Sequence, residues 1–138
     1  MRENVLTIGQ LAKQAEVGVE TVRFYERKGL IKKPAKSSGF RKYTFETVKR
    51  IKFIKRAQEL GFTLKEVASL LDLRLGAKST CGDVQQKAES KILEVNQKIQ
   101  DLKRIKRSLQ NLAKACKNKS ASVSECPILD SFETGVRN

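Results

Sequence analysis

A heptad pattern in the second half of the chain constrains its fold more than any other feature of the sequence. From about Asp83 to Cys116, apolar side chains recur with the alternating three- and four-residue spacing of a coiled-coil seam. The a positions are Gln85, Ile92, Ile99, Lys106 and Ala113, and the d positions are Ala88, Val95, Leu102, Leu109 and Cys116. Because most of these positions are apolar, the pattern predicts one long helix with an apolar stripe along its length.

Such a helix needs a partner. Helices of globular proteins average about 11 residues, and a domain formed by residues 1–75 is too small to cover so long a stripe. We therefore expect two copies of the chain to pair as a homodimer through a coiled coil formed by residues 76–138. A core helix of the same domain is the alternative interpretation.

Three cysteines mark the ends of the predicted helix, with Cys81 before it, Cys116 at its end and Cys126 in the tail beyond. A rise of about 1.5 Å per residue separates Cys81 from Cys116 by roughly 50 Å. No single metal ion can join these two thiols within one chain. If all three thiols cooperate, Cys81 of one protomer must meet Cys116 and Cys126 of a second protomer that runs antiparallel to the first.

The donor set favours a soft metal ion, because the chain has 3 Cys and no His. Three sulfurs suit trigonal Hg(II) or pyramidal Pb(II). Zn(II) almost always takes four ligands and would need water or a carboxylate such as Asp83 or Glu125. Cd(II) also prefers a fourth donor. We expect Hg(II) as the bound metal, with Pb(II), Cd(II) and Zn(II) as alternatives.

The first half of the chain predicts a helix-turn-helix. Thr7 and Gln10 have the spacing of a capping box, which opens a helix that runs to about Glu16. After a turn, a second helix spans about residues 19–28 and ends at Gly29. The net charge of +14 favours a polyanion partner, in most cases nucleic acid.

A small β-hairpin, or wing, is predicted after this helix pair. Its strands are expected at residues 30–32 and 40–43, around a turn marked by Pro34 and Gly39. Two more helices follow, one over about residues 45–60 and one from the Thr63 capping box to about residue 73. Residues 1–75 therefore form a mainly α winged helix-turn-helix domain with its connecting helices.

Residues of the second helix and of the wing are expected to contact double-stranded DNA. Thr21 and Arg23 suit base edges in the major groove, whereas the other basic residues suit phosphates. The hydroxyls of Tyr25 and Tyr43 are expected to donate to phosphate as well. The full predicted set is Thr21, Arg23, Tyr25, Arg27, Lys28, Arg41, Lys42 and Tyr43.

Four runs of residues, in this order, resemble the MerR family of transcriptional regulators: Thr7–Ala12, Glu20–Leu30, Gly39–Tyr43 and Ala57–Leu64. The resemblance implies a winged-helix DNA-binding domain joined by a long helix to an antiparallel coiled-coil dimer. It also implies a palindromic promoter whose spacer is too long for RNA polymerase. In that family, effector binding untwists and bends the DNA so that the promoter elements realign.

The three cysteines resemble the mercury sensors of that family, which split three cysteines across the dimer. Cys81, Cys116 and Cys126-Pro127 match those sensors residue by residue. One departure is the loop from Lys117 to Glu125, which is one residue longer than is usual in them. The resemblance therefore implies that the regulator switches on metal-resistance genes when Hg(II) binds.

Other classes of function fit less well. A cysteine enzyme would lack the histidine that usually activates a thiol, and an iron–sulfur cluster usually takes four cysteines. An architectural DNA-binding protein without an effector is the remaining alternative. No apolar run predicts a membrane span and no secretory signal is visible, so we expect a cytoplasmic protein with reduced thiols.

Overall fold

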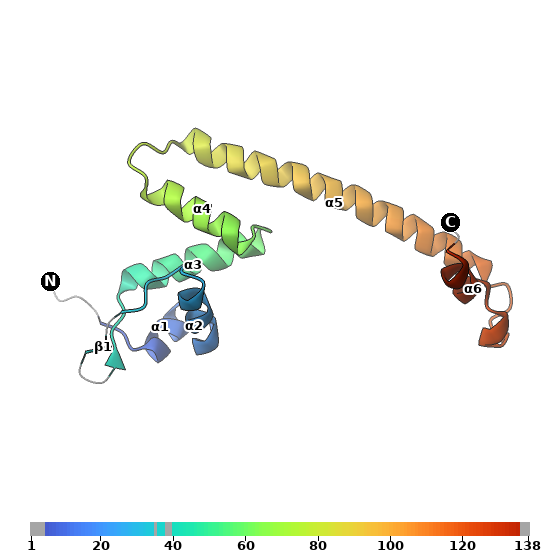
Figure 1. Ribbon diagram of the computed structural model, residues 1–138, viewed down its shortest axis with the longest axis horizontal. Helices are drawn as coiled ribbons and strands as arrows, with labels where there is room; N and C mark the ends of the chain where they lie inside the picture. The colour runs from blue at the N-terminus through green and yellow to red at the C-terminus, as the bar shows by residue number, and fades with distance from the viewer. Residues whose placement is uncertain (1–4, 35, 38–39, 136–138) are drawn as a thin grey trace. The chain divides into compact units, whose positions relative to one another are not determined.

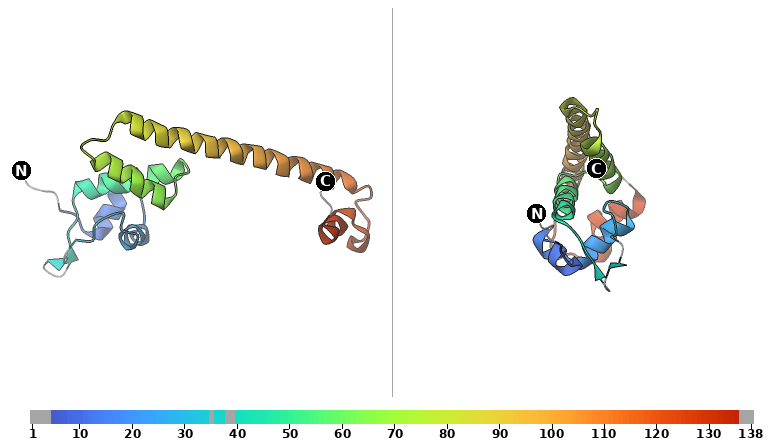
Figure 2. Two further views of the ribbon diagram at one scale, coloured as in Figure 1. Left: turned by 45° about the horizontal axis from the view of Figure 1, so that its top comes forward. Right: turned by 90° about the vertical axis from the view of Figure 1, so that its left-hand side faces the viewer.

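A computed structural model describes residues 5–34, 36–37 and 40–135 of the chain. The chain divides into two compact units, Met1–Gln85 and Gln86–Asn138. It is mainly helical, as predicted (Figures 1 and 2). The elements in chain order are α1 (Ile8–Gln14), α2 (Val19–Arg27), β1 (Lys36–Ser37), β2 (Phe40–Arg41), α3 (Phe45–Glu59), α4 (Leu64–Leu75), α5 (Cys81–Ala115), the 3-10 helix η1 (Val123–Glu125) and α6 (Pro127–Thr134).

Helix α1 begins at Ile8, directly after Thr7, as the predicted capping box of Thr7 and Gln10 indicated. Thr7 Oγ1 accepts a hydrogen bond from the Gln10 backbone N–H at 3.2 Å, and Gln10 Oε1 accepts one from the Thr7 N–H at 2.9 Å. These bonds satisfy N–H groups that a helix start leaves open. After α1, Glu16 turns the chain with a φ of 59°, and the Lys55 ammonium donates to the Glu16 carbonyl oxygen at 3.1 Å. The turn places α2 against α1, which also contacts α3.

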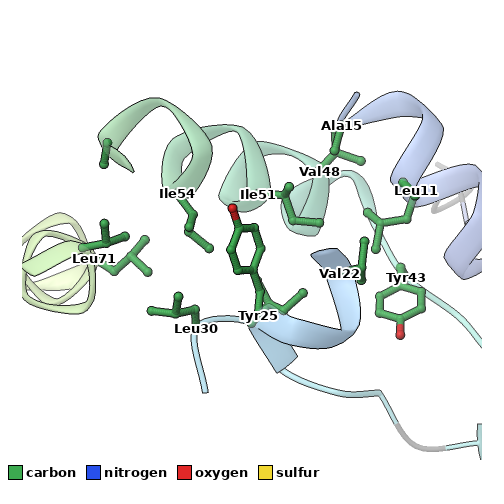
Figure 3. Close-up of a cluster of buried hydrophobic side chains, with 14 of the residues drawn as sticks. Leu11, Ala15, Val22, Tyr25, Leu30, Tyr43, Val48, Ile51, Ile54 and Leu71 are labelled. Carbon is green, nitrogen blue, oxygen red and sulfur yellow. The ribbon is translucent and has the colours of Figure 1, made fainter. Parts of the chain in front are cut away.

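An apolar core joins the helices of the first unit (Figure 3). Leu11 of α1, Val22 of α2, Ile51 and Ile54 of α3, and Val67 of α4 are all 0% exposed. Burying one such aliphatic side chain contributes about 1.5–3 kcal/mol. This shared core fixes the orientation of α2 and therefore of the side chains on its outer face.

The wing hairpin forms later in the chain than we predicted. Strands β1 and β2 pair antiparallel, with Lys36 opposite Arg41. Residues 30–32, the predicted first strand, form no strand. The predicted turn at residues 38–39 lies outside the described residues.

The physical reason for this correction is the end of α2. Gly29 takes a left-handed φ of 73°, and the Leu30 N–H donates to the Tyr25 carbonyl at 3.0 Å. The chain therefore folds back over the helix end, and Leu30 and Ile31 become core residues, 5% and 3% exposed. A Pro follows at position 34, which cannot donate a hydrogen bond in a strand.

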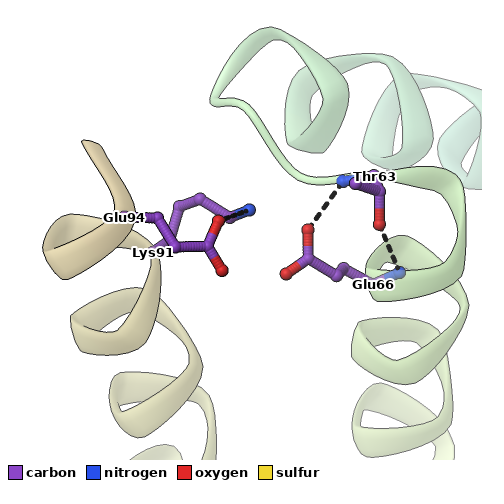
Figure 4. Close-up of polar contacts among 4 residues, drawn as sticks. All are labelled: Thr63, Glu66, Lys91 and Glu94. Carbon is purple, nitrogen blue, oxygen red and sulfur yellow. Dashed lines mark hydrogen bonds and ion pairs between the residues drawn. The ribbon is translucent and has the colours of Figure 1, made fainter. Parts of the chain in front are cut away.

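Helices α3 and α4 lie close to their predicted bounds and contact each other. Helix α3 stops before Gly61, whose φ is 94°. Helix α4 opens with the predicted capping box (Figure 4): Thr63 Oγ1 accepts from the Glu66 N–H at 3.2 Å, and Glu66 Oε1 accepts from the Thr63 N–H at 2.9 Å. The helix runs on to Leu75, slightly beyond the predicted end.

The predicted long helix is confirmed as α5, with 35 residues, and it begins earlier than expected. The Thr80 N–H donates to Asp83 Oδ2 at 2.9 Å, and the Asp83 N–H donates to Thr80 Oγ1 at 3.2 Å. This capping arrangement makes Cys81 the first helical residue, although we expected it to precede the helix. A Thr with an acidic residue three positions later was the signal in the sequence.

The apolar stripe of α5 is largely exposed in the single chain. Leu102 and Leu109, for example, are 63% and 57% exposed. Outside this stripe, α5 has one buried charged side chain among its described residues, Lys91. It is 7% exposed, and its ammonium lies 2.7 Å from Glu94 Oε2 (Figure 4). Neither α5 nor any other helix in the described part of the chain is long and apolar enough to cross a membrane.

The tail after α5 contains a helix that we did not predict. Helix α6 has Cys126 at its N-cap and Pro127 in its first turn, and it ends at Gly135 with a φ of 72°. Proline at the start and glycine just past the end are signals that the sequence offered. The short helix η1 comes directly before Cys126.

Candidate nucleic-acid interface and metal centre

Helix α2 turns an apolar face to the core and a charged face to solvent. Val22 and Tyr25 are buried, whereas Arg23, Arg27 and Lys28 are exposed. These three cations were predicted to contact DNA, and the structure leaves them on the outside of the helix.

Neighbouring side chains on α2 contact these cations. Arg23 Nη1 lies 3.7 Å from Glu20 Oε1. Arg27 Cζ and Lys28 Nζ lie 5.9 and 5.6 Å from the centroid of the Phe24 ring. Such a cation–π contact contributes about 0.5–1 kcal/mol at an exposed site. Two positive charges are thus gathered at the end of α2, which supports an anion-binding surface.

The two tyrosines are placed differently from our expectation. Tyr25 is 4% exposed, and its hydroxyl donates to Gln58 Oε1 at 2.7 Å. Tyr43 is 1% exposed, and its hydroxyl donates to Glu26 Oε2 at 2.9 Å. Both hydroxyls are therefore used inside the protein in this structure instead of being offered to phosphate. The rings complete the core, and the hydroxyls tie α2 to α3 and to the wing.

The environment keeps both hydroxyls protonated. Burial raises the pKa of Tyr25 above its ordinary value. Burial, with the hydrogen bond and negative charge of Glu26, raises the pKa of Tyr43 to about 12, although Arg41 and Arg23 act in the opposite direction. The raised pKa values extend the pH range in which each tyrosine stays protonated and donates its hydrogen bond to higher pH.

The wing adds further positive charge near α2. Lys42 is exposed, whereas Arg41 and Thr21 are half-buried. Among the side-chain atoms that the structure describes, Arg41 Nε is buried without a hydrogen-bond partner. Buried donors in proteins are nearly always paired, and because this nitrogen is shielded from solvent, the Arg41 side chain would have to move before Nε could meet an acceptor from outside the chain.

Sequence reasoning missed Glu26 and Gln58 as structural partners of the tyrosines. Glu26 lies 17 positions from Tyr43, and Gln58 lies 33 positions from Tyr25. Helical spacing links only residues three or four positions apart. No signal in the sequence could have paired these residues.

Two of the three cysteines share one pocket in the tail. Cys116, directly after α5, and Cys126, at the start of α6, both line a cavity of ≈ 480 Å³. The loop between them supplies most of the other walls, including Lys117 and Lys119. The loop between the two helices thus gathers two potential thiolate ligands in one pocket of the second unit.

Cys81 stands apart from this pair at the first residue of α5. The 35 residues of that helix span roughly 50 Å at 1.5 Å per residue. All three cysteines are free thiols. Within the described residues, no group of three or more Cys, Asp or Glu side chains comes together as a metal site. The tail of one chain therefore brings two sulfurs together, and the predicted site takes its third sulfur, Cys81, from a partner chain.

Comparison with known proteins places the chain in a family. The model for "MerR HTH family regulatory protein" matches residues 6–73, and the model for "MerR, DNA binding" matches residues 48–112. The chain is also 43% identical to the mercuric resistance operon regulatory protein of Bacillus cereus over 126 residues, which cover 91% of this chain and 95% of that protein. The chain belongs to the MerR family. It is a DNA-binding, metal-responsive transcription regulator, and its relatives are not enzymes.

Solved MerR-family structures resemble the whole fold. A transcription regulator from Ralstonia metallidurans in complex with lead(II) has a TM-score of 0.81 and 37% identity, with 92% of this chain and 98% of that one covered. The regulator MerR of Bacillus megaterium in complex with mercury(II) has a TM-score of 0.72 and 39% identity, with 93% and 99% covered. The predicted fold, a helix-turn-helix domain followed by a long C-terminal helix, is thereby confirmed.

Proposed function

We propose that this MerR-family chain binds promoter DNA as a homodimer and switches on metal-resistance genes when Hg(II) binds a three-cysteine site. Each site takes Cys116 and Cys126 from one protomer and Cys81 from its partner. The observation that carries the proposal is the shared pocket of Cys116 and Cys126, with Cys81 at the far end of a 35-residue helix. An antiparallel partner would bring its own Cys81 to that pocket.

The exposed stripe of α5 supports the dimer. Leu102, Ile105 and Leu109 line a shallow apolar groove on this helix. These side chains are 63%, 53% and 57% exposed. Exposing aliphatic side chains to water is unfavourable, because burying one of them would contribute about 1.5–3 kcal/mol to the stability of the dimer. A second α5 packed in heptad register would cover the groove.

The charged face of α2 and the wing supports the DNA partner. We expect Arg23 to read a base edge and Arg27, Lys28 and Arg41 to hold phosphates. The exposure of Arg23, Arg27 and Lys28 supports this assignment. A promoter-bound dimer that distorts the DNA would act together with RNA polymerase, as the family resemblance implies. This activity belongs in the cytoplasm.

Mercury is proposed as the metal because a curated relative is named for mercuric resistance and because three sulfurs suit Hg(II). Pb(II) is the alternative with an observation in its favour, since a solved neighbour carries lead(II). Cd(II) and Zn(II) remain alternatives of the same regulator type, and either would need a fourth ligand.

A competition titration tests the choice of metal. The reduced full-length protein is titrated with Hg(II), Pb(II), Cd(II) and Zn(II), and the sulfur-to-metal absorption bands are followed. We expect one Hg(II) per protomer, held against an excess of each other metal. Displacement of Hg(II) by stoichiometric Pb(II) would assign the site to lead instead.

A mixed dimer tests the sharing of the site. Neither the Cys81→Ser homodimer nor the Cys116→Ser/Cys126→Ser homodimer holds a complete site. If the site spans two chains, the heterodimer of these two variants regains one complete site and binds one Hg(II) through three sulfurs. If each site lay within one chain, the heterodimer would show no three-sulfur band. Ser79→Ala, next to the first helical turn, is the control and should bind as the unmodified protein does.

A further inference from the structure

The pocket of Cys116 and Cys126 is much larger than a metal ion requires. Its volume is ≈ 480 Å³, which lies in the range of about 300–1,000 Å³ that is typical of sites for small organic ligands. In the single chain, two thiols and a metal ion would therefore leave part of this cavity unfilled until the partner's Cys81 arrives.

The side chains that line the pocket carry a net positive charge. Lys117 and Lys119 both line it, together with the polar side chains Asn118 and Ser122. Glu125 is the acidic side chain of the lining. Exposed Lys114, in the last turn of α5, adds another cation nearby in the sequence. The lining thus combines two nucleophilic sulfurs with a net positive rim.

Two thiols beside a positive rim suit the form in which a thiophilic metal ion travels in solution. In a solution that contains small thiols, Hg(II) exists as a complex of two thiolates rather than as a free ion, because soft ligands hold it strongly. A carrier thiol that also bears carboxylates makes this complex an anion. A positive rim attracts anions, and a cleft lined by one sign of charge raises their association rate.

We propose that this pocket is a docking site for the metal complex of a small, carboxylate-bearing thiol. Lys117 and Lys119 hold the carboxylates while Cys126 and Cys116 replace the carrier thiolates on the metal. This inference rests on the proposed function and names the form in which the metal arrives.

The exchange needs no oxidant or reductant. A protein thiolate forms a new metal–sulfur bond, and one bond between the metal and a carrier sulfur breaks. The departing carrier thiolate takes up the proton that the protein thiol gives up. The same step at the second cysteine releases the second carrier thiol. The partner's Cys81 then adds the third metal–sulfur bond and releases its thiol proton to solvent.

Stopped-flow absorption on the reduced full-length dimer tests the docking site. The two probes are Hg(II) bis(3-mercaptopropionate), which is anionic, and Hg(II) bis(cysteamine), which is cationic. We expect the anionic probe to react about tenfold faster at low salt, and the ratio to shrink as salt screens the charges. Lys117→Gln/Lys119→Gln should bring the ratio close to one.

A matched control separates the pocket from the overall charge of the protein. Lys98 and Lys103 are exposed on α5 and do not line the pocket, so Lys98→Gln/Lys103→Gln removes the same charge elsewhere. This variant should keep the preference for the anionic probe. An equal loss of preference in both variants would overturn the docking site, as would equal rates for both probes with the unmodified protein.

The absorption spectrum at the end of the reaction distinguishes failure of the docking site from failure of the proposed three-cysteine sensor. If the three-sulfur band forms with normal amplitude but without any preference between probes, the docking site is wrong and the proposed sensor stands. If no three-sulfur band forms with either probe, both proposals are wrong.

Discussion

Tyr43 donates its hydroxyl to the carboxylate of Glu26 at 2.9 Å, and this bond joins the wing to helix α2. The Tyr43 backbone also pairs with Leu6 in an isolated antiparallel bridge. One buried residue therefore connects the start of the chain, helix α2 and the wing. The spacing between two elements expected to contact DNA depends on this residue.

Removing the Tyr43 hydroxyl should destabilise the first unit more than the same change at Tyr25. Tyr43→Phe takes the donor from a carboxylate, and hydrogen bonds to charged groups contribute about 1.5–3 kcal/mol. Tyr25→Phe takes the donor from the neutral amide of Gln58, for which about 0.5–1.5 kcal/mol is typical. Urea unfolding of both variants measures the difference. Equal losses would show that the carboxylate adds nothing to the bond.

The ionisation of Tyr43 should couple to folding at high pH. Its folded pKa of about 12 lies above the ordinary value of 10.0, so the protonated form is favoured in the folded state. The stability that this gives is complete below pH 10 and is lost as the pH rises from 10 towards 12.

Tyrosinate absorption in the Tyr25→Phe variant checks this prediction, because the chain has 2 Tyr and the variant keeps only Tyr43. The folded protein should titrate near pH 12, and the urea-unfolded protein should titrate near the ordinary value. A folded midpoint equal to the unfolded one would contradict the buried, hydrogen-bonded position of the ring.

A charge in the heptad seam of α5 should separate the protomers. Leu102 occupies a d position and is 63% exposed in the single chain, whereas Leu93, outside the seam, is 71% exposed. In a dimer Leu102→Asp removes two buried leucines, a loss on the order of 4 kcal/mol, or about a thousandfold in the dissociation constant. Sedimentation equilibrium should show a monomer for Leu102→Asp and a dimer for Leu93→Asp. Dissociation by both variants would place the interface elsewhere.

Two arginines of α2 should affect DNA binding in different ways. Arg23→Ala should lower affinity for the operator by about 1–3 kcal/mol and relax the sequence preference, because Arg23 is expected at a base edge. Arg27→Ala should weaken binding to operator and unrelated DNA alike and reduce the slope of the salt dependence by about 1. Fluorescence anisotropy with both DNAs over a range of salt concentrations measures each effect. Matching behaviour of the two variants would refute this division of roles.

The sequence by itself determined the helices and most of their ends. Thr7 with Gln10 and Thr63 with Glu66 fixed the starts of α1 and α4, because a capping box is closed by residues three positions apart. The heptads likewise determined the long helix. These features depend on neighbours along the chain, and their signals are therefore local.

Only the tertiary structure decided where the tyrosines and the tail cysteines lie. Tyr25 looked exposed from its place among charged residues of α2, yet it is buried against a residue 33 positions away. Cys126 joins Cys116 in one pocket because the intervening loop, together with η1, folds back to form most of its walls. Such contacts depend on how separate elements pack together, and no spacing within one element encodes them.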